Sequence, residues 1–215
     1  MRIAILGSGL MGAKLGTIFA RAGHDVIFSY SRSQRRLARL AREAGPRARS
    51  GTVAEAVRGS DVLLLAVHWT RVDDVLEQAG RLEGKTVVSC TLPMSADDSR
   101  LVVAQTSSGA EVLAKRVRPA RFVAAFGTVP SEVLFGVFAA RRRKSRPSLL
   151  YYGDDAAAKR VAARLARDAG FDPLDAGPLR VGRHAEPFTQ LIAQLAYEGT
   201  RGPELSYRFE WGARR

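Results

Sequence analysis

The sequence predicts an α/β protein of Rossmann type, with a doubly wound, mostly parallel sheet and a small C-terminal extension. Its first apolar run, residues 2–6, leads directly into the glycine-rich segment 7–12 and then into an apolar-periodic run at 13–22. Further short apolar runs alternate with helical patterns along the chain, and residues 61–67 are apolar throughout after Asp61. Such a run is typical of a parallel strand that is covered on both faces.

The glycine-rich segment has the spacing Gly-x-Gly-x-x-Gly between a strand and a helix. Gly7 would permit a tight turn, Gly9 would let the backbone approach a pyrophosphate, and Gly12 would let the helix pack closely on the sheet. The unpaired N–H groups and the dipole at the helix N-terminus favour an anion. We therefore predict a dinucleotide site here; the alternative is a glycine turn without a ligand.

The end of the second strand, expected at 25–29, discriminates between cofactors. NAD-specific sites place a carboxylate on the ribose about 20 residues beyond the glycines, but residues 30–36 contain no acid. Hydroxyl groups and arginines there would bind a 2′-phosphate by charge-assisted hydrogen bonds. NADP is the predicted cofactor, held by Ser31, Arg32, Ser33 and either Arg35 or Arg36, while Arg39 and Arg42 are expected on a solvated helix face.

Two central strands, expected at 61–67 and 85–90, end in His68-Trp69 and in Thr91-Leu92-Pro93-Met94. Ligands of open parallel sheets lie beyond the carboxyl ends of the strands, so these ends should line the nicotinamide side. His68 could donate a proton near the reacting ring, or could only shape the pocket. Cys90 is expected to be a small apolar filler rather than a nucleophile.

The rest of the chain predicts a helix at 99–115, a strand at 121–125, an exposed basic loop at 141–147 and a strand at 148–152. A helix then runs to Ala169, a last strand covers 171–175, and a final helix covers 186–198 with Leu191, Ile192, Leu195 and Ala196 on one face. The last fifteen residues should be loosely structured. We divide the chain into an NADP-binding Rossmann domain (1–146) and a small α/β part (147–215) that completes the acceptor site and a dimer interface.

Composition and charge limit the classes of function that the chain can have. The chain has 215 residues, a net charge of +13 and one cysteine. Its basic clusters carry no interleaved aromatic residues and no reading motif, so no nucleic-acid partner is predicted. The single cysteine indicates a reducing, cytoplasmic setting, and no apolar run reaches membrane-spanning length. No metal site, catalytic triad or carboxylate pair is expected.

Several motifs together resemble the NADP reductases that use the 8-hydroxy-5-deazaflavin coenzyme, coenzyme F420. These motifs are the glycine-rich segment, Ser31-Arg32, residues 66–69, residues 87–89 leading to Pro93, residues 126–130, residues 152–155 and above all residues 173–179. The resemblance implies a homodimer in which hydride passes directly between NADPH and a planar deazaflavin or flavin-like acceptor. It carries phosphate and ribose contacts onto Ser8, Gly9, Leu10, Met11, Gly12, Ser31, Arg32 and Arg36, and nicotinamide-side contacts onto Val67, Leu92 and Thr128. Gly7 and His68 are predicted to bind the cofactor from their places in the glycine turn and at the strand end. His68 departs from the family, which often has proline at this corner.

Two other functions remain open. One is reduction of a small carbonyl or imine, for which the chain lacks the expected long helix with a catalytic residue and a larger helical domain. The other is an NADP-binding sensor without turnover, which would use the basic loop 141–146 to reach a partner.

Overall fold

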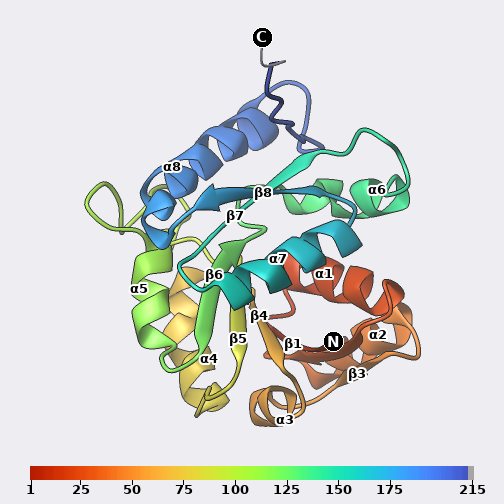
Figure 1. The fold of residues 1–215 in the computed structure, drawn as a ribbon. Coiled ribbons are helices and arrows are strands. Elements are labelled where there is room, and N and C mark those ends of the chain that lie inside the picture. The colour runs from red at the N-terminus through yellow and green to blue at the C-terminus, as the bar shows by residue number, and fades with distance from the viewer. Residues whose placement is uncertain (213–215) are drawn as a thin grey trace.

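A continuous eight-stranded sheet lies between two layers of helices in the computed structural model, which describes residues 1–212 (Figure 1). The strand order is β3-β2-β1-β4-β5-β6-β7-β8, and neighbouring strands are parallel except β6 and β7. The strands are β1 (Arg2–Leu6), β2 (Asp25–Ser29), β3 (Ala48–Ser50), β4 (Val62–Leu65), β5 (Thr86–Ser89), β6 (Arg121–Ala125), β7 (Ser148–Tyr152) and β8 (Asp172–Gly177). The predicted Rossmann-type fold class is confirmed.

Helices cover both faces of the sheet (Figure 1). One apolar core joins the sheet to α1 (Leu10–Arg21), α2 (Gln34–Ala44), α6 (Leu134–Ala139) and α7 (Ala156–Asp168). A second core joins the other face to α3 (Val53–Arg58), α4 (Val72–Ala79) and α5 (Gly109–Arg116). Helix α8 (Gly182–Ala193) contacts α5 and continues as a π-helical turn, Gln194–Glu198. This layering leaves the carboxyl ends of β1, β2, β4 and β5 open for a ligand.

The C-terminal part extends the same sheet. β7 joins β6 in antiparallel register, with Ala124 opposite Tyr152, and β8 follows in parallel. Residues 201–212 form no helix or strand, as expected, but they lie along β7, where the backbone oxygen of Tyr207 accepts the N–H of Ser148 at 2.8 Å. The expected loose end at 213–215 lies outside the described residues. A domain boundary after residue 146 stays a prediction.

The predicted helix at 99–115 is wrong in its first half, because the helix starts only at Gly109. Ser108 caps it by accepting the N–H of Glu111 at 3.2 Å, and the Glu186 carboxylate accepts the N–H groups of Gly109 and Ala110 at 2.8 Å each. The Ser-x-x-Glu spacing at 108–111 was the sequence signal for this start.

The final helix also differs from the prediction. It begins at Gly182 rather than at residue 186. Ile192 and Ala196 are buried, but Leu191 and Leu195 are exposed to 54% and 52%, so the four apolar residues do not form one buried face. Helix α6 was not predicted at all.

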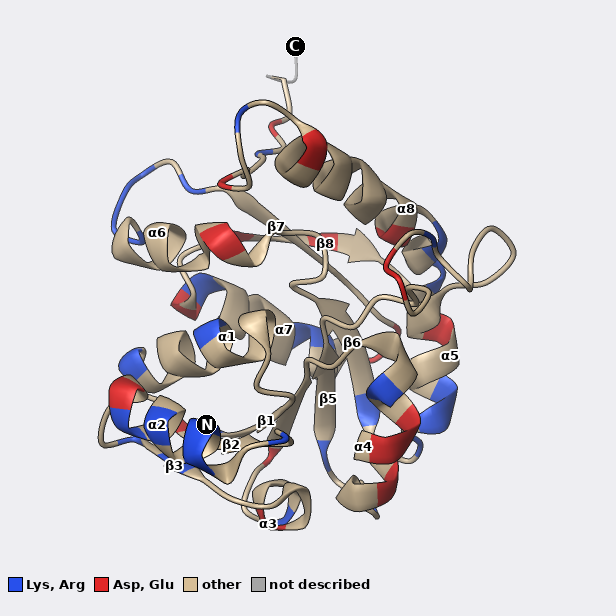
Figure 2. Cartoon of the chain, turned by 180° about the vertical axis from the view of Figure 1, so that it is seen from behind, with Lys and Arg blue, Asp and Glu red and all other residues tan. Residues whose placement is uncertain are grey.

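Basic residues are spread over α2, α5 and the loop after α6 rather than gathered on one surface (Figure 2). The loop 141–147 is largely exposed, as predicted, and Arg39 and Arg42 are exposed on α2. Among residues 1–212, none of the helices has the length and apolar character that crossing a bilayer requires.

Candidate functional site: two adjoining cavities at the sheet edge

The glycine loop between β1 and α1 is shaped by its close contacts. Gly7 has a φ of +111°, and a side chain on it would come within 2.4 Å of the backbone oxygen of Ala66. On Gly12, an added Cβ would lie 1.8 Å from the backbone oxygen of Gly7. By contrast, a Cβ on Gly9 would meet no protein atom within 4 Å. Gly7 and Gly12 are therefore required by packing, whereas Gly9 faces open space.

That open space adjoins the N-terminus of α1. Gly9 caps this helix without a side-chain hydrogen bond, and the first turn contains no acid. The N–H groups of the first turn lack intrahelical acceptors and therefore point toward the cavity as donors for an anion. This arrangement fits a pyrophosphate, as predicted from the glycine spacing.

A first cavity of about 570 Å³ extends from the glycine loop along the ends of β2 and β4. Arg32 and Arg36 line it, and of the two alternatives for the second arginine, Arg35 does not. Ser31 lines the cavity as well. Two guanidinium groups and a hydroxyl at the end of β2 fit the 2′-phosphate of NADP.

Ser33 has a different position. Its Oγ accepts the N–H of Arg36 at 3.3 Å and so caps α2, while its own N–H donates to Ser31 Oγ at 3.2 Å. Ser33 does not line the cavity and instead fixes the turn that presents Arg32 and Arg36.

Tyr30 and Asp74 form a contact that the sequence did not predict. Tyr30 has a φ of +58°, and its hydroxyl donates to Asp74, which also accepts from Gln78 at 3.0 Å. These two hydrogen bonds lower the pKa of Asp74, and burial together with the Asp74 contact raises the pKa of Tyr30 to about 12. An ionised carboxylate therefore lies in the first cavity, and it would repel a phosphate, which favours the Arg32 side for that group.

A second cavity of about 480 Å³ adjoins the first, and Gly9, Ala66, Val67 and His68 line both. Its walls are mostly apolar. They come from the N-terminus of α1, the segment after β5, the segment after β6, and α8 with its π-helical turn: Leu10, Met11, Cys90, Thr91, Leu92, Met94, Asp98, Phe126, Gly127, Val129, Pro130, Ser131, Thr189, Ile192, Ala193 and Tyr197. Of the predicted residues, Leu10, Met11, Val67, His68 and Leu92 meet here.

Thr128 is close in sequence to these walls but does not line either cavity. It is buried, and its Oγ1 lies 2.7 Å from the hydroxyl of Tyr207 in the C-terminal tail. Thr128 thus fastens the tail to the segment after β6. Gly12, which is also buried, contributes through packing of the loop rather than through the cavity surface.

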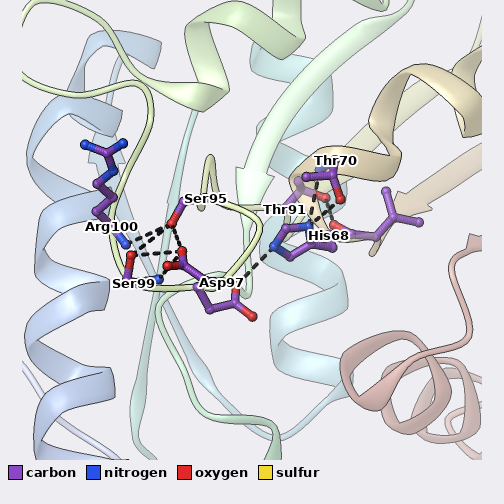
Figure 3. A network of polar contacts seen from close by, with 9 residues as sticks. His68, Thr70, Thr91, Ser95, Asp97, Ser99 and Arg100 are labelled. Carbon is purple, nitrogen blue, oxygen red and sulfur yellow. Dashed lines mark hydrogen bonds and ion pairs between the residues drawn. The ribbon is translucent and has the colours of Figure 1, made fainter.

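His68 lies at the boundary of the two cavities. Figure 3 shows the hydrogen bonds of its ring. Its Nδ1 is 3.3 Å from the backbone N–H of Thr70, which donates to it, and 2.8 Å from Thr70 Oγ1. Nε2 therefore carries the proton and donates to Asp98 Oδ1 at 3.1 Å. Because both ring nitrogens have protein partners, this arrangement favours the shaping role of His68 over proton donation.

The end of β5 is fixed to the end of β4. Thr91 Oγ1 donates to the backbone oxygen of Val67 at 2.9 Å, and Cys90 Sγ lies 3.5 Å from the backbone oxygen of Leu65. Burial raises the pKa of the Cys90 thiol to about 12, so the reactive thiolate is scarce near neutral pH. This is consistent with a filler rather than a nucleophile.

Helix α8 is attached to the rest of the site through Glu186. This side chain is 2% exposed and accepts two N–H groups at the start of α5. Burial raises its pKa to about 7, against the opposing effect of the two hydrogen bonds. Arg183, one turn earlier, pairs with Glu111 at 2.7 Å. Together they fix the wall that Thr189, Ile192 and Ala193 provide.

A polar cavity at a glycine loop, with an apolar cavity beside it at the strand ends, defines a dinucleotide-binding protein with room for a second ligand. Residues 2–93, somewhat less than half of the chain, match the model of the family described as NADP oxidoreductase, coenzyme F420-dependent.

The similar proteins agree with this assignment. Rat (Rattus norvegicus) metalloreductase STEAP3 is 31% identical over 185 residues, covering 86% of this chain, but the chain spans only 36% of that protein. The crystal structure of a candidate F420-dependent NADP-reductase from Arthrobacter sp. FB24 has a TM-score of 0.85 at 22% identity, covering 98% of this chain and 100% of that chain. An imine reductase from Myxococcus stipitatus, with NAD⁺ bound, has a TM-score of 0.64 at 20% identity, covering 90% of this chain and 60% of that one. The two structures show a shared fold. The family model that matches residues 2–93 is the one that the sequence motifs resemble, and its description names NADP and an oxidoreductase.

Proposed function

We propose that the chain is an NADPH-dependent oxidoreductase that transfers hydride directly between NADP(H) in the first cavity and a planar deazaflavin or flavin-like acceptor in the second. The observation that carries this proposal is the shared boundary of the two cavities, at Gly9, Ala66, Val67 and His68. A ligand in each cavity would meet the other there. Bound NADPH would supply the hydride, and the acceptor ring would take it up.

The residues of this chain would act by positioning. The N–H groups at the start of α1 hold the pyrophosphate, and Ser31, Arg32 and Arg36 hold the 2′-phosphate. Val67 presents apolar surface at the boundary and Leu92 in the second cavity, and these surfaces would exclude water and orient a flat ring. Apart from the hydrogen-bonded His68 and Asp98, the second cavity is lined by uncharged residues, which suits a ring rather than a small anion.

Steady-state oxidation of NADPH tests the proposal. The purified protein is offered a 5-deazaflavin, riboflavin, FMN, FAD and ferric chelates in turn, and cofactor binding is measured by calorimetry. Turnover with a ring acceptor supports the proposal. NADPH binding without turnover by any of them contradicts it, and would favour a carbonyl or imine substrate or a sensor.

Two further predictions stay with this proposal. The homodimer that the family resemblance implies is tested by light scattering on the eluting protein. A cytoplasmic location, expected from the single cysteine, is tested by fractionation of the source cells.

A further inference from the structure

Residues 94–101, here called the flap, form a compact hairpin that provides part of the second cavity wall. Met94 and Leu101 pair in a β-bridge, and the backbone N–H of Ser95 donates to the oxygen of Arg100 at 2.8 Å. Met94 and Asp98 line the cavity. The flap thus faces the space in which we place the acceptor.

A hydroxyl-rich network holds the flap together from within (Figure 3). The carboxylate of Asp97 accepts from Ser95 Oγ at 2.6 Å and from Ser99 Oγ at 2.9 Å, and Ser95 Oγ accepts the N–H of Arg100 at 3.2 Å. These hydrogen bonds fix the shape of the flap from within. These internal hydrogen bonds do not determine where the flap lies relative to the sheet.

The contact that fixes this position is the pair formed by His68 and Asp98. Asp98 sits in the turn of the flap with a φ of +57°, which aims its carboxylate toward His68. On the other side, Thr70 fixes the imidazole through Nδ1, so that Nε2 presents its proton to Asp98. The pair spans from the end of β4, at the cofactor cavity, to the flap.

We propose that His68 and Asp98 are a positioning pair that holds the flap against the β4 end and so limits the size of the acceptor that can enter the second cavity. This inference rests on the proposed function for the identity of the acceptor, but not for the position of the flap. The side chain of Asp98 is 71% exposed, so the contact is weak and can break readily. A weak contact suits a wall that must open for each acceptor.

The test uses Asp98→Ala, which removes the pair and leaves the internal network of the flap intact. Asp172→Ala is the matched control, because Asp172 is an exposed aspartate at the start of β8 that lines neither cavity. Cys90, the single cysteine, lines the second cavity and serves as the probe. Its alkylation by iodoacetamide at fixed pH is followed by intact mass, without cofactor or acceptor.

We expect Asp98→Ala to alkylate about two- to fivefold faster than the wild type, the range that follows from losing one exposed hydrogen bond to a carboxylate, and Asp172→Ala to match the wild type. Equal rates in all three proteins, or equal acceleration in both variants, would overturn the proposal. The conservative variant Asp98→Asn, which can still accept from Nε2, should restore part of the slow rate.

A kinetic readout separates positioning from general stability. FAD and riboflavin carry the same ring, but riboflavin has the smaller substituent. In Asp98→Ala, the ratio of kcat/KM for FAD to kcat/KM for riboflavin should rise about two- to fivefold. The Kd for NADPH and the Tm should not change. An unchanged ratio would overturn the size limit. If the wild type oxidises NADPH with none of the ring acceptors, the 5-deazaflavin included, the proposed function fails, while the alkylation rates still decide the role of the pair.

Discussion

The two cavities are built in different ways, although they share a wall. The first is lined by the β1 turn, the segments after β2 and β3, the end of β4 and α4, and its charged groups are three arginines and Asp74. The second is assembled from segments near residues 10, 66, 92, 98, 128 and 192, and its lining is mostly apolar. The charged and polar lining of the first cavity suits a dinucleotide with phosphate groups, whereas the apolar lining of the second suits a flat ring.

The largest expected effect concerns the phosphate end of the first cavity. Arg32→Asp removes a charge-assisted partner and adds a repulsive charge, so the preference for NADPH over NADH should fall by about 100-fold or more. Calorimetry with both cofactors measures this. Arg39→Asp, further along α2 and exposed, is the control and should leave the preference unchanged. Equal weakening of both cofactors by Arg32→Asp would show that Arg32 does not bind the 2′-phosphate.

A pair of glycine substitutions separates packing from binding in the same loop. Gly12→Ala places a Cβ against the backbone of Gly7 and should lower the free energy of unfolding by about 1 to 3 kcal/mol. Gly9→Ala meets no protein atom within 4 Å, so stability should be unchanged while the Kd for NADPH rises about tenfold. Chemical denaturation and calorimetry give the two quantities. Equal loss of stability in both variants would mean that Gly9 does not face open space.

The stability of the protein should depend on pH through Glu186, which attaches the α8 wall of the second cavity to α5. Its pKa is raised from 4.5 to about 7, so between these values the native state holds a proton that the unfolded state has released. The stabilisation is therefore greatest below about pH 4.5 and is lost as the pH rises through about 7.

Unfolding of the wild type and of Glu186→Gln at pH 5 and pH 8 checks this. The free energy of unfolding of the wild type, relative to the variant, should fall by about 1 to 3 kcal/mol between the two pH values. Other titrating groups are common to both proteins and cancel. A constant difference would show that Glu186 is already ionised throughout.

The smallest expected effect concerns binding of the acceptor in the second cavity. Ala193→Phe fills part of the second cavity and should raise the KM for the acceptor about tenfold while the Kd for NADPH is unchanged. Leu191→Phe, on the exposed side of the same helix, is the control. A matching rise in the Kd for NADPH would indicate that the two cavities do not bind separate ligands.

The difference between the cavities also explains what the sequence could predict. Gly7 belongs to the glycine-rich segment 7–12, and Ser31 and Arg32 follow directly after the second strand, so the chain neighbours of each residue predict its position. Asp74 and Tyr30 are 44 residues apart, so only the fold, which places the first turn of α4 near the end of β2, brings them together. Leu92 was placed correctly from the strand end.

Positions that depend on contacts between residues far apart in the chain could not be predicted from the sequence. Thr128 turns to Tyr207, 79 residues away, and the start of α5 depends on Glu186, 76 residues from Ala110. The flap has turn-forming residues that a helical interpretation of 99–115 overlooked, and the contact between Asp98 and His68 could not be inferred before β4 and the flap were placed side by side.

The central claim is that the cavities bring NADPH and a ring acceptor into direct contact, and isotope transfer tests it most directly. The protein is mixed in unlabelled water with a 5-deazaflavin acceptor and NADPH that carries deuterium at the reacting carbon of its nicotinamide, in turn on each face. Mass spectrometry of the reduced acceptor should find the deuterium at its ring carbon from one face only. Reduction of the acceptor without deuterium from either face, or binding of NADPH without reduction, would contradict the account.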